Sequence, residues 1–445
     1  MNIDTALQKL ETDGRPIQVG LVGAGASARA VALQLGTPVP GIRLAGIANR
    51  TAAHAERSLQ EAGITRWRSA SSAQAAEDAV RQGAAVLTED PSVLTGCDAI
   101  DVIVEATGTI APAARTVLDG LEHGKHVVLV NAELDSLLGP ILKAKADQAG
   151  VVLTHTDGDE PGVAMTLLRY LRSTGMRPVA AGNLKGMVDY YRTPETQRNF
   201  AAERGLDPWK VTSFADATKL SMETTVLSNA TGFHAGRRGM YGPACKEVQE
   251  MAGLLPVEQM LDSGLVDYAL GAAPYTGAFV IVHEENVLKR AQLAYYKLGD
   301  GPFYVFYTPF HLPHVQIAST IGRAVIHRDA TVAPLEGPVC EVVAVAKRDL
   351  QAGERLDGIG GFCTYGLIDN TATARSMDAL PIGLSAGCVL RRNIAKDDVL
   401  SVHDVESLAG GLAVSLWEEQ RKRWQVQLET GSPGTMLTEA GGVRA

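Results

Sequence analysis

The sequence has few cysteines, few aromatic residues and no long hydrophobic run. Its 445 residues include five widely spaced cysteines and no CxxC pair, which excludes a disulfide framework and a zinc or redox motif. We expect ordinary buried thiols at Cys97, Cys245, Cys340, Cys363 and Cys388. No apolar run approaches the ~18 residues that span a bilayer, and the charged N-terminus lacks the apolar core of a secretory signal. These absences predict a cytoplasmic protein with no membrane partner.

An excess of positive charge is also absent. The 41 Lys and Arg residues against 50 Asp and Glu residues give a net charge of -9, which argues against a nucleic-acid partner and favours a small-molecule substrate. Glycine, in contrast, is abundant at 46 residues, without the period of collagen. The positions of these glycines therefore deserve a structural or functional explanation.

Short apolar runs alternate with helical stretches from residue 17 to about 156, a pattern typical of βαβ units around a parallel sheet. A second region, to about residue 335, mixes helical segments with β-rich ones such as GAFVIVHE and GPFYVFYTPF. The predicted fold class is α/β, with an N-terminal Rossmann parallel sheet and a central α+β domain. The predicted N-terminal strands are Ile17–Val22, Arg43–Ala48, Ala99–Glu105, His126–Val130 and Val151–Thr154.

A weak internal repeat marks the C-terminal region. KRDLQAGERLDG (Lys347–Gly358) and RRNIAKDDVLSV (Arg391–Val402) each follow a short β run and carry cations, an Asp or Asn and an aliphatic residue before a turn. This pattern predicts a small module with a duplicated β-clip. We expect a dinucleotide-binding domain over 1–160, a substrate-binding domain over 161–337, the β-clip over 338–427 and a flexible tail over 428–445; a role of the second domain in dimerisation is implied only by the family resemblance given below.

The first strand leads into IQVGLVGAGASA, which places a dinucleotide-binding pattern between a strand and a helix. Gly23 would make the tight turn, Gly25 would admit a pyrophosphate, and the small Ala28 would allow close helix packing. Ala26 opens the helix whose N-terminal amides would face the phosphates. The alternative is a glycine-rich turn without a ligand.

The end of the second strand indicates which cofactor is bound. NAD-binding chains place a carboxylate there for the ribose, whereas this sequence has Asn49, Arg50 and Thr51. Because Arg50 can pair with a 2'-phosphate, we expect NADP; a solvated surface cation is the alternative. Further candidates for the cofactor site at the same sheet edge are Thr107, Gly108 and Asn131, with Glu133 assigned to the substrate.

Catalysis of hydride transfer needs a group that exchanges a proton with the substrate oxygen. Asp216, Lys219 and Glu223 are spaced to share one helical face, and Lys185 lies between Gly182 and Gly186. We expect Lys185, Asp216, Lys219 and Glu223 to be catalytic. A surface salt-bridged helix and a turn cation are the alternatives.

Other polar segments admit more than one interpretation. HTDGDEPG contains Asp157, Asp159 and Glu160, which either bind a divalent cation such as Mg²⁺ or Mn²⁺ or form a solvated acidic turn. Arg237 and Arg238 are candidates for an acidic or phosphorylated substrate or are exposed loop cations. In YTPFHLPH, His311 is a substrate-site candidate, while both His311 and His314 also suit a core or interface position.

These motifs together resemble two known families. VGAGASA, EATGT, VNAE, GNLKGMVDYY and DATKL resemble the homoserine dehydrogenase superfamily, and the duplicated C-terminal segments resemble the SAF β-clip domain. The combination is similar to the 1-deoxy-D-xylulose 5-phosphate reductoisomerase-like proteins, NADPH-dependent enzymes that can replace the usual reductoisomerase of isoprenoid synthesis. The resemblance also implies a homo-oligomer, and it transfers the family's catalytic Asp and Lys to Asp216 and Lys219.

The differences from homoserine dehydrogenase matter for the substrate. Glu133 stands where that family usually has a lysine, and Lys185-Gly186 replaces its Asn-Gly turn. The resemblance therefore implies NADPH reduction coupled to a skeletal rearrangement. A homoserine or other hydroxy-acid dehydrogenase is the alternative, and a cofactor-binding regulatory protein is an alternative of another class.

Overall fold

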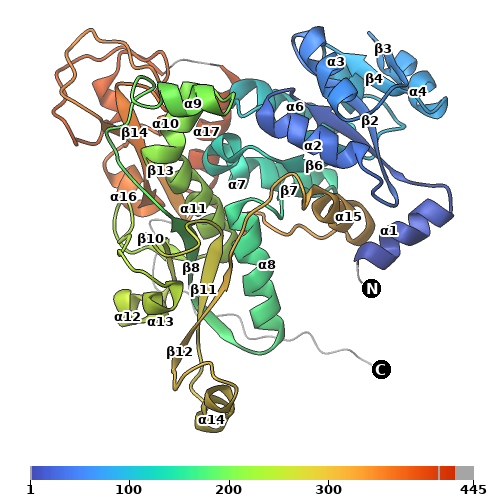
Figure 1. The fold of residues 1–445 in the computed structure, drawn as a ribbon. Helices are drawn as coiled ribbons and strands as arrows, with labels where there is room; N and C mark the ends of the chain where they lie inside the picture. The colour runs from blue at the N-terminus through green and yellow to red at the C-terminus, as the bar shows by residue number, and fades with distance from the viewer. Residues whose placement is uncertain (1–2, 409–410, 426–445) are drawn as a thin grey trace.

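The computed structural model describes residues 3–408 and 411–425 and shows three regions packed side by side (Figure 1). The predicted tail over 428–445 lies outside the described residues. No described helix has the length and apolar character needed to cross a bilayer. All five cysteines are buried and free, as predicted.

The N-terminal region is a seven-stranded parallel sheet in the order β3-β4-β2-β1-β5-β6-β7. The strand order reverses at β1, where α/β sheets bind ligands beyond the carboxyl ends of their strands. The strands are β1 (Ile17–Val22), β2 (Ile42–Ala48), β3 (Trp67–Ser69), β4 (Ala85–Thr88), β5 (Val102–Glu105), β6 (His126–Leu129) and β7 (Leu153–His155).

Helices cover both faces of this sheet, because alternate strand residues enter different cores. Val102 and Val104 pack on one side, and Ile103 packs on the other. The first face is covered by α1 (Ile3–Thr12), α2 (Ala26–Gly36), α3 (Ala52–Glu61) and the distant α15 (Ile317–His327). The second face is covered by α4 (Ala73–Arg81), α5 (Ser92–Thr95), α6 (Ala111–Glu122) and α7 (Ala132–Ala149).

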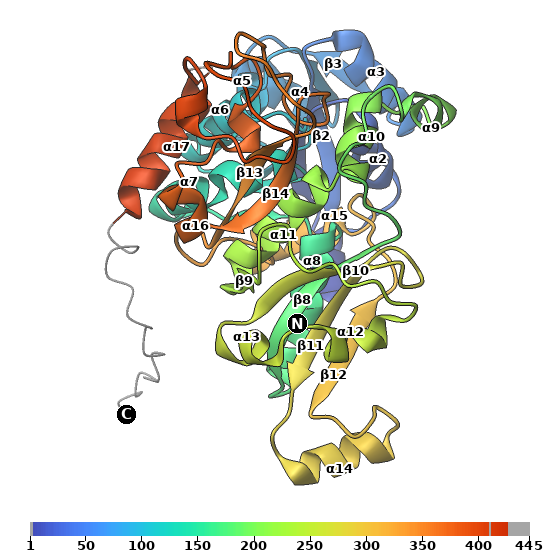
Figure 2. The same ribbon diagram turned by 90° about the vertical axis from the view of Figure 1, so that its left-hand side faces the viewer.

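The central region is an α+β unit built on a five-stranded mixed sheet in the order β12-β11-β8-β10-β9. α8 (Glu160–Ser173) and α11 (Thr218–Thr231) pack on one face of it. The strands are β8 (Arg177–Lys185), β9 (His234–Ala235), β10 (Leu265–Leu270), β11 (Ala278–His283) and β12 (Phe303–Thr308). The remaining helices are α9 (Arg198–Glu203), α10 (Pro208–Ala215), α12 (Met251–Leu254), α13 (Val257–Asp262) and the projecting α14 (Val287–Tyr295) (Figures 1 and 2).

The C-terminal region contains the antiparallel pair β13 (Cys340–Ala346) and β14 (Thr364–Asn370), then α16 (Thr371–Ser376) and α17 (Leu412–Arg423). The two copies of the sequence repeat pair with each other: Leu350 and Ile394, at equivalent positions, exchange backbone hydrogen bonds of 2.9 and 3.0 Å. Gly353 and Asp397, again equivalent, both have positive φ, at +83° and +69°. The repeat is therefore a structural duplication around a local twofold axis.

Helix α17 packs against α7 with several buried apolar side chains and one buried polar side chain, that of Gln420. Gln420 accepts a hydrogen bond from the Ile141 amide at 3.1 Å and donates one to the Leu137 carbonyl at 3.0 Å. Pro140 lies between these two residues and lacks the N–H that would bond to the Ser136 carbonyl in an uninterrupted helix. Gln420 thus supports α7 next to its proline, one helical turn beyond the residues that approach the candidate site.

Candidate functional site

The turn after β1 opens a cleft of about 730 Å³ at the carboxyl ends of the central strands. Gly23 has a φ of +114°, and a Cβ at this position would lie 2.9 Å from the Ala106 carbonyl oxygen. Only glycine permits this close turn. Gly25 is the N-cap of α2, and a Cβ there would meet nothing within 4 Å. The backbone at Gly25 is therefore open to a ligand such as a pyrophosphate.

The cleft gathers half of the residues expected at the cofactor: Gly23, Gly25, Asn49, Arg50 and Thr107 line it. The others lie around it. Ala26 begins α2, Ala28 is completely buried, Thr51 is the N-cap of α3, and Gly108 faces a neighbouring pocket.

Asn131 is buried behind the cleft rather than lining it. Its side chain accepts a hydrogen bond from the Leu134 amide at the start of α7 and donates to Glu105 Oε2 at 2.6 Å. Glu105 also accepts from the Thr107 hydroxyl at 2.5 Å. Burial raises the pKa of Glu105 to about 7, although its hydrogen bonds from Thr107 and Asn131 act in the opposite direction. This network fixes the strand edge on which the cofactor would rest.

Several cleft residues were not predicted. Asp90, Pro91 and Ser92 follow β4, a strand too short to be recognised in the sequence. Thr109 lies just before α6, and Arg115 lies within that helix. The EATGT motif pointed to Thr109, but no local pattern distinguishes Arg115 from other helical cations.

A second pocket, of about 390 Å³, lies beside Gly108 where the N-terminal sheet meets the central region. It brings together three of the four predicted catalytic residues and two of the predicted substrate residues. They are Lys185 at the end of β8, Lys219 and Glu223 on α11, Glu133 on α7, and His311. Asp159, Glu160, Lys210 and Phe214 also line this pocket.

Two of the three pocket lysines, Lys185 and Lys219, pair with acidic side chains. Lys185 Nζ lies 2.8 Å from Glu160 Oε1 and 3.4 Å from Glu223 Oε2, and Lys219 Nζ lies 3.4 Å from Glu133 Oε2. Burial alone lowers the pKa of each lysine, but the neighbouring carboxylates outweigh it and the pKa of each is raised. The two lysines are therefore ammonium groups that donate hydrogen bonds, and neither is a ready base.

Glu223 is the pocket group best suited to exchange a proton near neutral pH. Burial raises its pKa to about 8, and the nearby Glu160 adds to the effect, while Lys185 lowers it. Its Oε2 also accepts a hydrogen bond from Asn183 at 3.3 Å. Glu223 can therefore hold a proton at neutral pH and release it within the pocket.

Asp159, Glu160 and His311 form a cluster in which one donor atom of each lies within 4.8 Å of the others. Burial alone would raise the pKa of Asp159, but hydrogen bonding to His155 and the charge of Lys219 lower it overall. Asp159 is thus ionised. Two carboxylates and an imidazole are donors that Mn²⁺ and Mg²⁺ accept.

Asp216 does not join the other catalytic candidates, and the expectation that it shares a helical face with Lys219 is wrong. Asp216 ends α10, and Ala217, at a φ of +69°, separates it from α11. Its carboxylate instead lies 2.8 Å from Lys347 Nζ in the C-terminal region. Both side chains are buried, so Asp216 joins two parts of the fold and does not orient Lys219.

The two predicted anion-binding arginines also lie elsewhere. Arg237 donates to the carbonyl oxygens of Met240 and Tyr241, and Arg238 pairs with Asp369 at 2.7 Å. Neither lines the cleft or the pocket. Arg237 stabilises its own loop, and Arg238 joins this loop to β14. The sequence had led us to expect a substrate contact, but in this geometry neither arginine is placed to contact a substrate in the cleft or the pocket.

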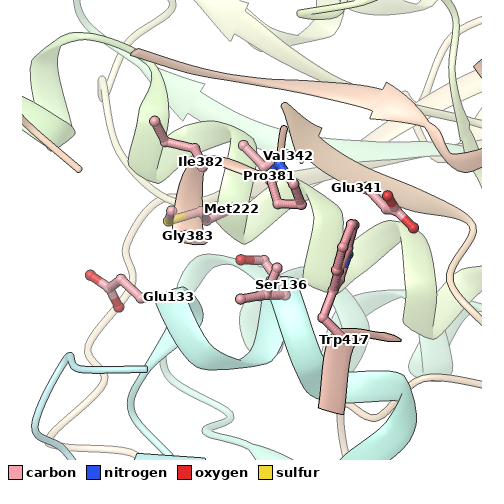
Figure 3. A pocket seen from close by; sticks show the side chains of 10 residues that line it. Glu133, Ser136, Met222, Glu341, Val342, Pro381, Ile382, Gly383 and Trp417 are labelled. Carbon is pink, nitrogen blue, oxygen red and sulfur yellow. The ribbon is translucent and has the colours of Figure 1, made fainter. Parts of the chain in front are cut away.

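A small cavity between α7, α11, the segment 381–383 and α17 is no alternative substrate site (Figure 3). Its free volume is about 10 Å³, roughly enough for one water molecule. This cavity is too small for a substrate or a cofactor. The cleft, lined by Thr107 and Thr109, and the pocket, lined by Gly108, are larger and adjoin each other.

Two protein-family models match successive parts of the chain. Residues 20–155 match the NAD-binding domain of homoserine dehydrogenase, and residues 158–317 match the catalytic domain of oxidoreductase DRL. The chain is an oxidoreductase. Its N-terminal region is an NAD(P)-binding domain, and the pocket residues Asp159, Lys185 and Glu223 fall in the oxidoreductase domain. Neither match reaches the C-terminal region, so its resemblance to SAF domains stays a prediction.

No curated protein sequence matches the chain significantly. Solved structures with a similar fold include a probable dehydrogenase from Thermotoga maritima, with 13% identity over 72% of this chain and 91% of that chain and a TM-score of 0.41. Another is scyllo-inositol dehydrogenase from Lactobacillus casei with bound NAD(H) and scyllo-inositol, with 11% identity over 71% of this chain and 90% of that chain and a TM-score of 0.39. At these scores the likeness carries no argument about the site.

Proposed function

We propose that this oxidoreductase rearranges the carbon skeleton of a phosphorylated hydroxy-ketone and uses NADPH to reduce the resulting aldehyde, with 1-deoxy-D-xylulose 5-phosphate as the specific substrate. The observation that carries this proposal is the meeting of Lys185, Lys219 and Glu223 with the Asp159–Glu160–His311 cluster beside the cofactor cleft. These are hydrogen-bond donors, a proton donor and cation ligands within one small pocket. They suit the reduction of a carbonyl whose neighbouring hydroxyl binds a cation.

Preference for NADPH is supported by Arg50. This exposed side chain lines the cleft just beyond the end of β2, and no carboxylate follows it at the strand end. A guanidinium at this place pairs with a 2'-phosphate. Bound NADPH would supply the hydride that the reaction consumes.

Lys185 and Lys219 share one task in this reaction, and Glu223 has another. Lys185 and Lys219, each held by a carboxylate, donate hydrogen bonds to the substrate carbonyl oxygen and so favour the negative charge that develops on it. Glu223 in its neutral form gives a proton to that oxygen as the hydride reaches the carbon. The rearrangement breaks one carbon–carbon bond of the substrate, forms another and leaves an aldehyde, with no net change in electrons. One hydride and one proton then convert this aldehyde to the alcohol.

Lys210 supports the choice of a phosphorylated substrate. Its ammonium lies at the pocket mouth, 3.3 Å from where a Cβ on Gly108 would stand. Within the described residues Lys210 has no carboxylate partner, unlike Lys185 and Lys219. It is therefore available to a substrate phosphate, a role that Arg237 and Arg238 cannot fill from their positions.

The residues present also fit a divalent cation, Mg²⁺ or Mn²⁺. Asp159, Glu160 and His311 would hold it, and the ion would supply Lewis-acid stabilisation of adjacent substrate oxygens. Glu160, one of these candidate ligands, also has its Oε1 at 2.8 Å from Lys185 Nζ. Because the ammonium and a bound metal ion repel each other, we expect the hydrogen bond from Lys185 to Glu223 to become its main contact when the ion is bound.

The direct test incubates the purified protein with 1-deoxy-D-xylulose 5-phosphate, NADPH and Mn²⁺ and follows NADPH absorbance at 340 nm. We expect oxidation of NADPH and formation of 2-C-methyl-D-erythritol 4-phosphate in equal amounts. Absence of oxidation at every substrate concentration would reject this substrate. Reduction of NADP by homoserine or another hydroxy acid would instead identify a dehydrogenase on the same scaffold.

A further inference from the structure

Three buried side chains from separate segments form a line that ends in the substrate pocket. His155, at the end of β7, has Nδ1 at 3.0 Å from Asp135 Oδ2 on α7 and Nε2 at 2.9 Å from Asp159 Oδ2 at the start of α8. The histidine side chain is 0% exposed, and those of Asp135 and Asp159 are 4% and 11% exposed. Only Asp159 lines the pocket.

The ring of His155 bridges the two carboxyl groups. Its two nitrogens point in opposite directions, and each lies within hydrogen-bond distance of one carboxyl oxygen. Asp135 therefore fixes one side of the ring, and the other side of the ring fixes Asp159.

The surrounding backbone is shaped to hold this line. A side chain at Gly139, one turn after Asp135 on α7, would collide with the Asp135 carboxylate. Asp159 is the N-cap of α8, yet its side chain makes no capping hydrogen bond there. The carboxylate of Asp159 therefore does not accept a hydrogen bond from the first turn of α8, as an N-cap aspartate usually does, and contacts His155 instead.

We propose that Asp135 and His155 are positioning residues that fix the carboxylate of Asp159 in the substrate pocket as a ligand for a divalent cation. This inference rests on the cation site of the proposed function and extends it to two residues that do not touch the pocket. A carboxylate has about four acceptor positions, and His155 occupies one of them. Asp159 also lines the same pocket as Glu160 and His311, and one donor atom of each of the three residues lies within 4.8 Å of the others.

The test measures Mn²⁺ affinity from the electron paramagnetic resonance signal of free Mn²⁺, with full-length protein and no substrate. Asp135→Asn keeps the size of the side chain, and His155→Gln keeps one donor. We expect each to weaken Mn²⁺ binding about 10- to 100-fold, the usual effect of removing a group that orients a metal ligand. NADPH affinity, read by fluorescence, should stay within twofold of the wild-type value.

Asp267→Asn is the matched control. Asp267 is equally buried, accepts hydrogen bonds from the Tyr241 and Gly242 amides at 3.0 and 2.8 Å, and lines neither the cleft nor the pocket. It should lose stability but bind Mn²⁺ like the wild type. If His155→Gln does not fold, Asp135→Asn decides the question.

Unchanged Mn²⁺ affinity in folded Asp135→Asn, or no Mn²⁺ binding by the wild type, would overturn the inference. Its failure is separable from that of the proposed function. A wild type that oxidises NADPH with the sugar phosphate while Asp135→Asn binds Mn²⁺ normally would keep the function and reject the positioning role. A wild type that binds Mn²⁺ tightly but does not oxidise NADPH, together with the expected loss of Mn²⁺ affinity in Asp135→Asn, would keep the positioning role and reject the proposed function.

Discussion

The carboxylate of Asp216 and the ammonium of Lys347 lie 2.8 Å apart, and both side chains are almost inaccessible to solvent. The same ammonium donates to the carbonyl oxygens of Arg192 and Gly361. One lysine therefore connects the C-terminal region to the junction of α10 and α11, which carries Lys210 and Lys219 into the pocket.

Lys347→Ala should lower the free energy of unfolding by about 3 to 5 kcal/mol, because it leaves Asp216 as an uncompensated buried charge. Urea denaturation of the whole chain measures this. The double variant Lys347→Met with Asp216→Leu should lose less than Lys347→Ala, since no charge stays buried alone. A loss in Lys347→Ala of less than about 1 kcal/mol would contradict this account of the pair.

Arg50→Ala should raise the Kd for NADPH roughly tenfold to a hundredfold and leave the Kd for NADH unchanged. Hydrogen bonds to a charged group contribute ~1.5 to 3 kcal/mol, which corresponds to that range. Fluorescence titration gives both constants. Arg57→Ala, on the exposed face of α3 and paired with Glu61, is the control and should bind both cofactors normally. Equal losses for NADPH and NADH would exclude recognition of a 2'-phosphate.

Glu223→Gln should lower kcat by about 10² to 10⁴, the usual contribution of a general acid, with NADPH affinity unchanged. Because the pKa of Glu223 is about 8, the wild-type rate should fall as the pH rises through that value and the neutral form is lost. The variant should lack this limb of the pH profile. Glu258→Gln, at an exposed position on α13, should behave as the wild type. Retention of the alkaline limb in Glu223→Gln would assign the proton to another group.

Glu105 links stability to pH. Burial raises its pKa from the ordinary 4.5 to about 7 in the folded protein, so the folded state binds more protons than the unfolded state between these values. The contribution is greatest below about pH 4.5, and up to about 3 kcal/mol is lost as the pH rises through 7. Denaturation midpoints from pH 5 to 8 should show this slope. Glu105→Gln should flatten it, whereas the exposed Glu122→Gln should not.

Gln420→Ala should destabilise the protein by about 1 to 3 kcal/mol, because it removes two buried hydrogen bonds to the backbone of α7. Lys422→Ala, two residues away on the exposed side of α17, should change stability by no more than about 0.5 kcal/mol. Chemical denaturation compares the two. Equal effects would mean that α17 supports α7 through surface packing alone.

Local pattern was enough to predict much of the N-terminal sheet. β1 spans the residues expected, because its apolar run is bounded by Pro16 and Gly23. The other four expected strands are present with ends shifted by up to three residues. β3 and β4 were not predicted, because strands of three or four residues show too little periodicity. The cleft residues that follow β4 were therefore not predicted either.

The sequence predicted many of the individual pocket residues but not which side chains contact each other. Local spacing brought Lys219 and Glu223 to one helical face, and the structure keeps them there. Asp216 was misplaced because an alanine at positive φ breaks the helix, and alanine gives no sequence signal for that conformation. The line from Asp135 through His155 to Asp159 joins the α7 segment to residues 20 and more positions later, which only the tertiary fold can reveal.

The contact between Gln420 and α7 has a consequence for the order of synthesis. Glu133 lies at the start of α7, whereas the side chain that bonds the Leu137 carbonyl and the Ile141 amide comes 283 and 279 residues later. A nascent chain that has emerged only through the N-terminal sheet lacks these bonds. The helix that carries Glu133 toward the pocket therefore gains these two bonds only after residue 420 has been synthesised.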